Sequence, residues 1–422
     1  MDPALLLLVP TRSYRTGDFL AAARALGVPV IVGSDLCHGV EERLGAREGE
    51  VSLDFRRPER AAERVAALAS VRPIGGVVAT DEGTAIIAAL AAARLGLAHN
   101  PPDATRRAGN KHLQRDALRA AGLPVPPFSL HALADGPERA AAAVPYPCVL
   151  KPLVLSASRG VIRADGPGAF VVAWRRIERI LDAARSERRP RDEDAARFLL
   201  VEGFVPGPEV ALEGLLRGGR LEVLALFDKP DPLDGPFFEE TLYVTPSRHP
   251  AATQEEVERL VGRSAAALGL AEGPLHAEVR LGPAGPVVLE VAARSIGGLC
   301  ARTLRFGAGV TLEEVIVAHA MRRPLATLQR ERRAAGVMML PIPRGGMLRG
   351  VAGVEAARAV PGVEDVVITV PDGREVQPLP EGDAYLGFAF ARGERPEEVE
   401  AALRAAHARL ELDIRPPLPT ME

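Results

Sequence analysis

The segment LHAEVRLGPAGPVVLEVAARSIGG, residues 275–298, constrains the fold more than any other part of the sequence. Apolar residues on both sides of the turn-forming sequence GPAG predict two antiparallel strands joined by a short loop. If the loop is Pro283–Gly285, with Gly285 in a left-handed conformation, Glu278 on the first strand lies directly opposite Glu290 on the second. The hairpin therefore brings two carboxylates to close range.

Each strand of this hairpin carries further side chains on the face of its glutamate, because residues two apart point to the same side. These neighbours are His276 and Arg280 on the first strand, and Val288, Ala292 and Arg294 on the second. Like charges that face each other destabilise a strand pair unless a cation lies between them. Magnesium is the natural candidate, since carboxylates and substrate phosphates usually hold it. A solvated face that carries two acids is the simpler alternative, and the hairpin alone does not decide.

The three lysines give a second signal. Among 52 basic residues only Lys111, Lys151 and Lys229 are lysines, and each lies at the end of a predicted element, which indicates sites that need a compact ammonium. Lys151 precedes the small-residue loop Ser156–Gly160, whose backbone amides can approach phosphate oxygens, although the spacing is not that of a Walker motif. The three positions favour a polyanion site over unrelated surface lysines.

The first hundred residues alternate between predicted strands, at 5–9, 28–32 and 76–79, and predicted helices, at 18–26 and 59–69. This βαβ rhythm predicts a parallel sheet covered by helices. The sequence TDEGT, residues 80–84, follows the third strand, so Asp81 either binds a ligand at the edge of the sheet or caps the next helix. The first strand leads into PTRSYRTG rather than G-x-G-x-x-G, which argues against an NAD-dependent oxidoreductase.

The remaining chain divides at HNPPDAT, residues 99–105, a predicted break that precedes a helix beginning near Asn110. Further strands are predicted at 148–151, 198–201 and 210–216, and the turn EGFVPGPE separates the last two. The charged run at 186–194 is expected to be a solvated connection. From about Gly336 onward, short strands and a final helix at 396–410 are predicted to form a third unit.

Composition excludes several classes of protein. A formal net charge of −3 gives no basic excess for nucleic acid, and the leading apolar run at 4–9 is too short for a membrane span or a signal peptide. Cys37, Cys148 and Cys300 lack metal spacing and cannot all pair, so a reducing cytoplasm is expected.

Taken in order, the segments NKHLQRDALRAAGLPVP, VLKP with SASRGV, VEGFVPGPE, HAEVRL and LEVAARSIGG resemble the ATP-grasp superfamily. Within it, the chain looks most like carboxylate-amine ligases of the L-amino-acid ligase group. The resemblance implies an α/β fold, α+β in the middle region, with three domains. These are a Rossmann-like domain at 1–100, an ATP-grasp domain at 101–328 with a lid subdomain at about 124–205, and a small α+β domain at 329–422.

The resemblance also implies roles for individual residues. It assigns the phosphates of ATP to Lys111 and Lys151, and to Ser158, Arg159 and Gly160 of a closing loop. It assigns the adenine to Glu202, Gly203, Phe204 and Val205, the ribose to Glu209, and magnesium, or manganese, to Glu278 and Glu290. Arg294, with Gly297 and Gly298, would bind the substrate carboxylate and stabilise the reacting charge. Lys229, His276, Glu239 and Glu240 would contact the phosphoryl group or the amine, and Tyr14, Arg15 and Asp81 would line the substrate site or stabilise the fold.

The implied reaction joins a small carboxylate and an amine through an acyl phosphate, with release of ADP, in an enzyme that is commonly a cytoplasmic homodimer. One position departs from the pattern, because Ala292 stands where similar proteins commonly carry asparagine as a further metal ligand. A catalytically impaired ATP-binding protein is therefore an alternative. A biotin-carboxylase-like enzyme that uses carboxyphosphate is another, although no biotin-carrier segment is evident.

Overall fold

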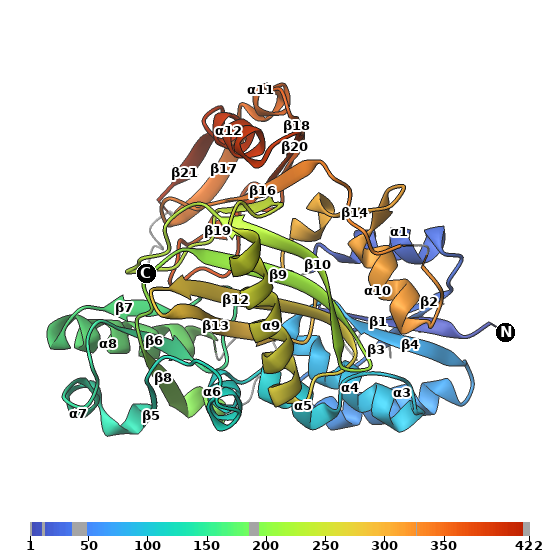
Figure 1. Cartoon of the computed structure of the whole chain (residues 1–422), viewed down its shortest axis with the longest axis horizontal. Helices are drawn as coiled ribbons and strands as arrows, with labels where there is room; N and C mark the ends of the chain where they lie inside the picture. Colours follow the sequence, from blue (N-terminus) through green and yellow to red (C-terminus); the bar gives the residue numbers. More distant parts are fainter. Residues whose placement is uncertain (1, 11–12, 36–48, 185–193, 326, 417–422) are drawn as a thin grey trace, which may run out of the picture.

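The computed structural model describes residues 2–10, 13–35, 49–184, 194–325 and 327–416. Its elements form an N-terminal parallel sheet, a small antiparallel sheet and a large antiparallel sheet that continues into the C-terminal region (Figure 1). No helix among these residues is long and apolar enough to cross a membrane. Cys37 and nearly all of the charged run at 186–194 lie outside the described residues.

The N-terminal sheet has four parallel strands in the order β3-β2-β1-β4. They are β1 Ala4–Val9, β2 Val30–Ser34, β3 Glu50–Ser52 and β4 Ile74–Ala79, with helices α1 Thr16–Ala25, α3 Pro58–Ala69 and α4 Glu82–Leu95. The predicted parallel sheet is confirmed. Strand β3 was not predicted, because its three residues are too few to show alternation.

A second sheet, in the order β5-β8-β6-β7, forms the lid together with helices α7 and α8. Its elements are β5 Phe128–Ala132, α7 Pro137–Ala141, β6 Cys148–Pro152, β7 Ile162–Ala164, α8 Pro167–Ala184 and β8 Phe198–Gly203. Phe170, Trp174 and Ile177 on one face of α8 are fully buried against this sheet. Strand β8 runs two residues further than predicted, so Glu202 and Gly203 belong to a strand and not to the turn after it.

The largest sheet has eight strands, in the order β13-β12-β9-β10-β11-β16-β20-β18. They are β9 Glu209–Arg217, β10 Arg220–Lys229, β11 Leu242–Thr245, β12 Gly273–Gly282, β13 Gly285–Ala292, β16 Ala334–Leu340, β18 Val363–Ile368 and β20 Gly387–Gly393. Strand β11 pairs with β16 from Leu242 to Thr245, so one sheet passes from the central region into the C-terminal region (Figure 1). The predicted domain boundaries at 100 and 328 stay predictions.

Helices and a small sheet complete the fold. The helices are α5 Pro102–Ala108, α6 Lys111–Ala120, α9 Ala251–Leu268, α10 Leu312–Ala320, α11 Val354–Arg358 and α12 Pro396–His407. The short strand pair β14 Arg305–Phe306 and β15 Val310–Thr311 precedes α10, and β17 Gly346–Ala352, β19 Glu375–Val376 and β21 Glu411–Arg415 form the last sheet. The predicted break at 99–105 was wrong in part, because two prolines open α5 there. The final helix ends at His407, three residues earlier than predicted.

The hairpin β12–β13 has the predicted pair but not the predicted loop. Gly282 pairs with Gly285, so the loop has two residues, and a bulge between Val288 and Glu290 supplies the extra residue that brings Glu278 opposite Glu290. The bulge also turns Val288 to the other face, where it is fully buried in the apolar core. The prediction that Val288 shares the face of Glu290 was therefore wrong.

Candidate functional site

A cleft between the lid and the large sheet collects most of the predicted nucleotide-site residues. Those that line it are Lys111, Lys151, Ser158, Glu202, Gly203, Phe204, Val205, Glu209, Glu240, Glu278 and Glu290. Pro126, Val149, Val161, Leu233, Phe238 and Leu289 give the cleft apolar walls. A cleft that combines apolar walls with two ammonium groups and several carboxylates is suited to a ligand with a flat apolar part and a polyanionic part.

Lys151 is held at the cleft by Glu202. The Lys151 Nζ lies 2.6 Å from a Glu202 oxygen, and the Arg115 Nε donates to the other oxygen. Arg115 also donates to the Leu289 carbonyl at 2.6 Å, which ties the lid to the strand that carries Glu290. Burial would raise the pKa of Glu202, but Arg115 and Lys151 together lower it to about 2. No sequence pattern indicated that Arg115, on α6, belongs to this site.

Replacing Glu202 with glutamine is expected to lower the free energy of unfolding by about 3 kcal/mol near neutral pH, because two buried cations lose their partner. The pKa of Glu202 is lowered to about 2 in the folded protein, below the ~4.3 of a free glutamate. Its contribution is therefore present above the unfolded pKa and is lost as pH falls toward the folded value. Urea unfolding of both proteins tests this. A difference that does not shrink between about pH 5 and about pH 3 would contradict it.

The loop Ser156–Gly160 adopts an uncommon backbone. Ala157 and Ser158 have φ of 55° and Gly160 has φ of 72°, all in the left-handed region. The Lys111 Nζ donates to the Leu155 carbonyl just before the loop, at 2.9 Å. Arg159 turns away from the cleft, is nearly buried, and donates from Nε to the Glu381 carbonyl at 3.0 Å. Ser158 therefore lines the cleft and Arg159 does not, and their predicted contacts with ATP phosphates stay predictions.

The predicted adenine segment is partly engaged within the protein. The Gly203 N–H donates to the Pro127 carbonyl at 2.8 Å, and the Phe204 N–H donates to the Pro147 carbonyl at 2.9 Å. These two N–H groups are therefore not available to a nucleotide base. The Phe204 ring packs beneath the Arg163 guanidinium, 4.1 Å from its centroid, which fixes one wall of the cleft.

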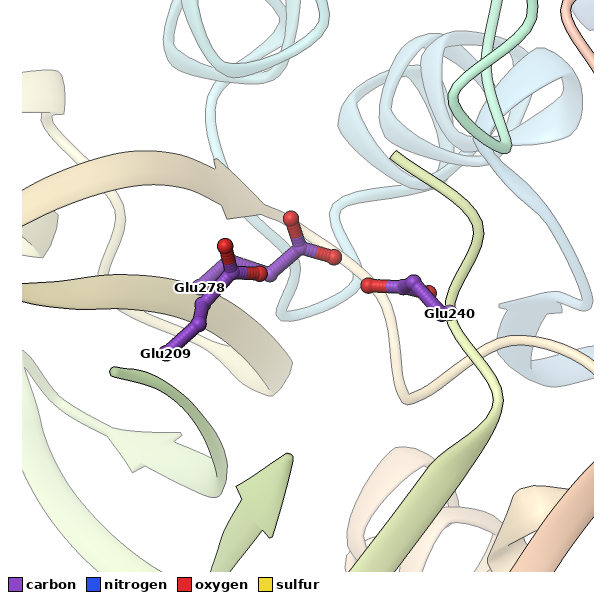
Figure 2. Close-up of side chains that lie close together, drawn as sticks. All are labelled: Glu209, Glu240 and Glu278. Carbon is purple, nitrogen blue, oxygen red and sulfur yellow. The ribbon is translucent and has the colours of Figure 1, made fainter. Parts of the chain in front are cut away.

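Lys229 lies among three carboxylates that line the cleft. Figure 2 shows Glu240 reaching toward Glu209 and Glu278 from the opposite side. One oxygen from each of these glutamates lies within 4.8 Å of the others. The Lys229 Nζ is 2.6 Å from Glu209 and 3.6 Å from Glu278, and it donates to Glu240. The buried ammonium thus neutralises charge that would otherwise separate the three acids.

The charges in this cluster are unequal. Burial raises the pKa of Glu240 to about 7, against the pull of Lys229 and with the help of the neighbouring acids. The pKa of Glu278 is lowered well below its usual range, because Lys229 and His276 outweigh its burial. The same three acids overcome burial to raise the pKa of Lys229. Glu278 is therefore an anion near neutral pH, as a metal ligand must be.

Glu278 and Glu290 fit a divalent cation. They are paired across β12 and β13, and both line the cleft that Lys111 and Lys151 also line. Carboxylate oxygens are the donors that Mg²⁺ prefers. Ala292 is buried opposite His276 and offers no oxygen, so the nearby donors among the described residues are these two acids, with Glu209 and Glu240 beside Glu278.

His276 and Arg15 are both buried, and each makes polar contacts with neighbouring segments. The His276 Nδ1 lies 3.2 Å from Glu213, and its Nε2 lies 3.8 Å from Glu278. Burial opposes a charge on His276, but these two carboxylates raise its pKa. Arg15 donates to the Thr80 carbonyl and to the Ser295 Oγ, both at 2.8 Å. Arg15 thus joins the N-terminal sheet to the segment after β13, which is the stabilising role proposed as one alternative.

Arg294 meets an acid that the sequence did not single out. Its Nε lies 3.2 Å from Glu82, the residue after Asp81, and its Nη1 donates to the Ser295 carbonyl at 3.0 Å. Asp81 accepts from the Thr84 N–H at 3.2 Å in a capping box at the start of α4. Of the two acids in TDEGT, Asp81 caps the helix and Glu82 reaches the site. The only sequence signal for these two roles was position, since Asp81 directly precedes α4 and Glu82 is its first residue.

Replacing Glu82 with glutamine is expected to lower kcat/KM of the proposed reaction about 100-fold, since a charge-assisted contact that orients Arg294 is lost. Asp81→Asn is the matched control, because asparagine also caps helices, and its kcat/KM is expected to stay within about twofold. Steady-state kinetics of both variants gives the comparison. Equal losses, or a larger loss for Asp81→Asn, would remove Glu82 from the site.

Several other predicted residues do not line the cleft. Glu239 is half-buried, and burial raises its pKa. Gly298 has φ of 61°, and a side chain there would come within 2.8 Å of the Phe388 ring, so close packing with the C-terminal region explains this glycine. Tyr14 is half-exposed and packs edge-on against Phe388, 5.7 Å between centroids. The space beside Gly297 is open.

Three family models match the chain in sequence order. The ATP-grasp N-terminal domain matches residues 20–99, the ATP-grasp domain matches residues 144–303, and the L-amino acid ligase C-terminal domain 2 matches residues 338–415. These matches confirm the resemblance found from the motifs.

Known proteins support the same grouping. The chain is 26% identical to the uncharacterized protein y4rH of Sinorhizobium fredii, over 99% of this chain and 84% of that protein. It is 32% identical to carnosine synthase 1 of Gallus gallus, over 80% of this chain and 37% of the relative. It spans less than half the length of the carnosine synthases that it matches. The crystal structure of an L-amino acid ligase from Bacillus licheniformis superposes with a TM-score of 0.81 at 26% identity, covering 98% of this chain and all of that one.

Proposed function

Because the chain belongs to the ATP-grasp superfamily, we propose that it is an ADP-forming carboxylate-amine ligase that makes carbon–nitrogen bonds. The observation that carries the proposal is the pair Glu278 and Glu290 in the wall of the cleft that Lys111 and Lys151 line. Two acids and two ammonium groups around one apolar slot are suited to a nucleoside triphosphate with a divalent cation. The similarity to an L-amino acid ligase and to carnosine synthases supports this reaction class.

The proposed reaction has two steps. A substrate carboxylate oxygen attacks the γ-phosphorus of ATP, and ADP leaves, which gives an acyl phosphate. An amine then attacks the acyl carbon, phosphate leaves, and the nitrogen loses a proton to give the amide. Lys111 and Lys151 would hold phosphate oxygens, and Arg294 would bind the carboxylate, so that catalysis is mainly positioning and charge neutralisation. Magnesium, or manganese, bound by Glu278 and Glu290 would neutralise charge on the phosphates.

The surroundings of Arg294 favour a small amino acid as one substrate. Glu82 lies 3.2 Å from the Arg294 Nε, so a cationic and an anionic group stand side by side. An α-amino acid presents a carboxylate and an ammonium at similar separation, and each would meet a group of opposite charge. A second small molecule that carries an amine completes the proposed pair of substrates.

A nucleotide-binding protein without ligase activity is the second candidate, and Ala292 favours it. This side chain is buried at the end of β13 and supplies no oxygen to a cation. The first candidate is preferred because Glu278 and Glu290 line the cleft, and Arg294 is close enough to both for their charges to help raise its pKa against its burial.

One assay separates the candidates. Purified protein with Mg²⁺, ATP, pooled amino acids, other carboxylates and hydroxylamine should release ADP and form a hydroxamate, because hydroxylamine traps an acyl phosphate. AMP and pyrophosphate would overturn the mechanism. ATP binding without ADP release across all pools would favour the second candidate, and ADP release dependent on bicarbonate alone would favour a biotin-carboxylase-like reaction.

A further inference from the structure

Glu381 joins the C-terminal region to the lid. It lies in the segment between β19 and β20, and its carboxylate accepts two hydrogen bonds from Arg176 on α8, at 2.6 and 2.8 Å. Its backbone carbonyl accepts from the Arg159 Nε at 3.0 Å, and the neighbouring Pro380 carbonyl accepts from the Gly160 N–H at 3.0 Å. Two adjacent residues thus receive four hydrogen bonds from two parts of the lid.

These contacts add to the loop's own backbone hydrogen bonds, from the Arg159 N–H to the Ser156 carbonyl and from the Val161 N–H to the Ser158 carbonyl. Ala157 and Ser158 are in the left-handed region, which residues with a side chain rarely occupy, so surrounding contacts must stabilise this backbone. Ser156, Ala157 and Ser158 line the cleft, whereas Arg159 and Gly160 face the C-terminal region. The loop therefore has one side toward the proposed phosphates and the other side anchored on Glu381 and Pro380.

The segment that carries Glu381 and Pro380 leads directly into the large sheet. Strand β20, which follows Glu381, pairs with β16 along its whole length, and β16 pairs with β11. Strand β11 in turn pairs with β10, the strand that ends in Lys229, and Glu240 lies just before β11. The lid is thus attached to the same sheet that carries the carboxylate cluster.

We propose that Glu381 is a positioning residue, which holds the Ser156–Gly160 loop and α8 in place over the cleft while the acyl phosphate waits for the amine. This inference rests on the proposed ligase function. An acyl phosphate is lost to hydrolysis when water enters, so a loop held in position couples ATP cleavage to amide formation. The C-terminal region thereby contributes to the reaction although it lies outside the family model of the ATP-grasp domain.

The test uses Glu381→Gln, which removes the charge and one strong acceptor but keeps the shape. Hydrogen exchange of the peptide that contains residues 156–164 is measured in the full chain with Mg²⁺ and a nonhydrolysable ATP analogue. The variant keeps the Glu381 and Pro380 carbonyls that hold the loop but loosens the segment that carries them, so we expect exchange there to be about tenfold faster. With substrates, the ratio of ADP to amide is expected to rise from about one to two or more, as hydrolysis competes with the amine.

Glu400→Gln is the matched control. It removes the ion pair between Glu400 on α12 and Arg248, 2.9 Å, which also joins the C-terminal region to the central region but lies away from the loop. Its exchange at 156–164 and its product ratio are expected to match those of the unmodified protein. Arg176→Lys keeps the charge but loses the two-pronged contact, so intermediate values are expected.

The Arg176 and Glu381 side chains are 34% and 39% exposed, so the pair adds little to global stability, and the variant is expected to fold. Unchanged exchange and an unchanged product ratio in Glu381→Gln would overturn the proposal, even if the protein proves to be a ligase. Faster exchange in a protein without ligase activity would support the holding of the loop and refute the ligase function.

Discussion

Replacing Glu290 with glutamine is expected to lower kcat about 1000-fold, because the proposed cation site loses the charge that holds it and several kcal/mol of phosphate-charge stabilisation. Glutamine keeps the shape and one oxygen, and Glu290 is only partly buried in the cleft wall, so the fold is expected to survive. Steady-state rates of ADP release, measured with increasing Mg²⁺, give the size of the loss and show whether more metal recovers part of it.

The matched control for this prediction is Glu258→Gln, which makes the same change at an exposed position of α9. Its rate and its Mg²⁺ dependence are expected to match those of the unmodified protein. Far-UV circular dichroism and the urea midpoint would show that Glu290→Gln is folded. If this variant turned over at the normal rate, Glu290 would not be a metal ligand, and the fit of the hairpin to magnesium would fail.

The hairpin β12–β13 shows which features of the site could be predicted from sequence patterns. Alternation and the turn sequence predicted the pairing of Glu278 with Glu290, and the structure confirms it. The loop length was wrong, because a bulge near Leu289 has no signature in the sequence and a two-residue loop with a bulge gives the same pair as a three-residue loop. The error changed only the face of Val288.

Contacts between segments that are distant in the chain could not be predicted from the sequence. Lys229 was identified as one of three lysines, but its place among Glu209, Glu240 and Glu278 depends on strands that are far apart in the chain. Arg115 and Glu82 were missed for the same reason, since each reads as an ordinary helix residue until the fold brings it to Glu202 or Arg294. Hydrophobic periodicity predicts which residues pair within one hairpin, and it does not predict pairing between domains.

The continuity of the eight-stranded sheet from the central to the C-terminal region was also not predicted. The C-terminal strands were predicted as a separate unit from about Gly336 onward, because short strands followed by a final helix are typical of a new domain. The pairing of β11 with β16 joins them to the central sheet. Neither β11 nor β16, both interior strands of this sheet, shows in its sequence which strand it will meet, so this link required the fold itself.

Lys229→Met is expected to lower the free energy of unfolding by about 3–5 kcal/mol at pH 8, because the buried acids Glu209, Glu240 and Glu278 lose their shared cation. Without the ammonium, repulsion raises the folded-state pKa of these carboxyls above the unfolded value. Groups with raised folded pKa values bind more protons when folded, so the variant should gain stability as pH falls from about 8 to about 5.5. In the unmodified protein Glu240, whose pKa is raised to about 7, also binds a proton in this range, but the total change should be smaller because Lys229 stays charged.

Urea unfolding in EDTA at the two pH values measures this difference without any metal in the cluster. The double variant Lys229→Met with Glu240→Gln removes one of the three charges, so it is expected to recover part of the loss at pH 8 and to depend less on pH. A loss that is the same at both pH values would show that Lys229 contributes by packing and not by charge. Mg²⁺ added to Lys229→Met offers a second check, because three carboxylates with oxygens within 4.8 Å of one another would then bind the cation in place of the ammonium, and the unfolding midpoint should rise.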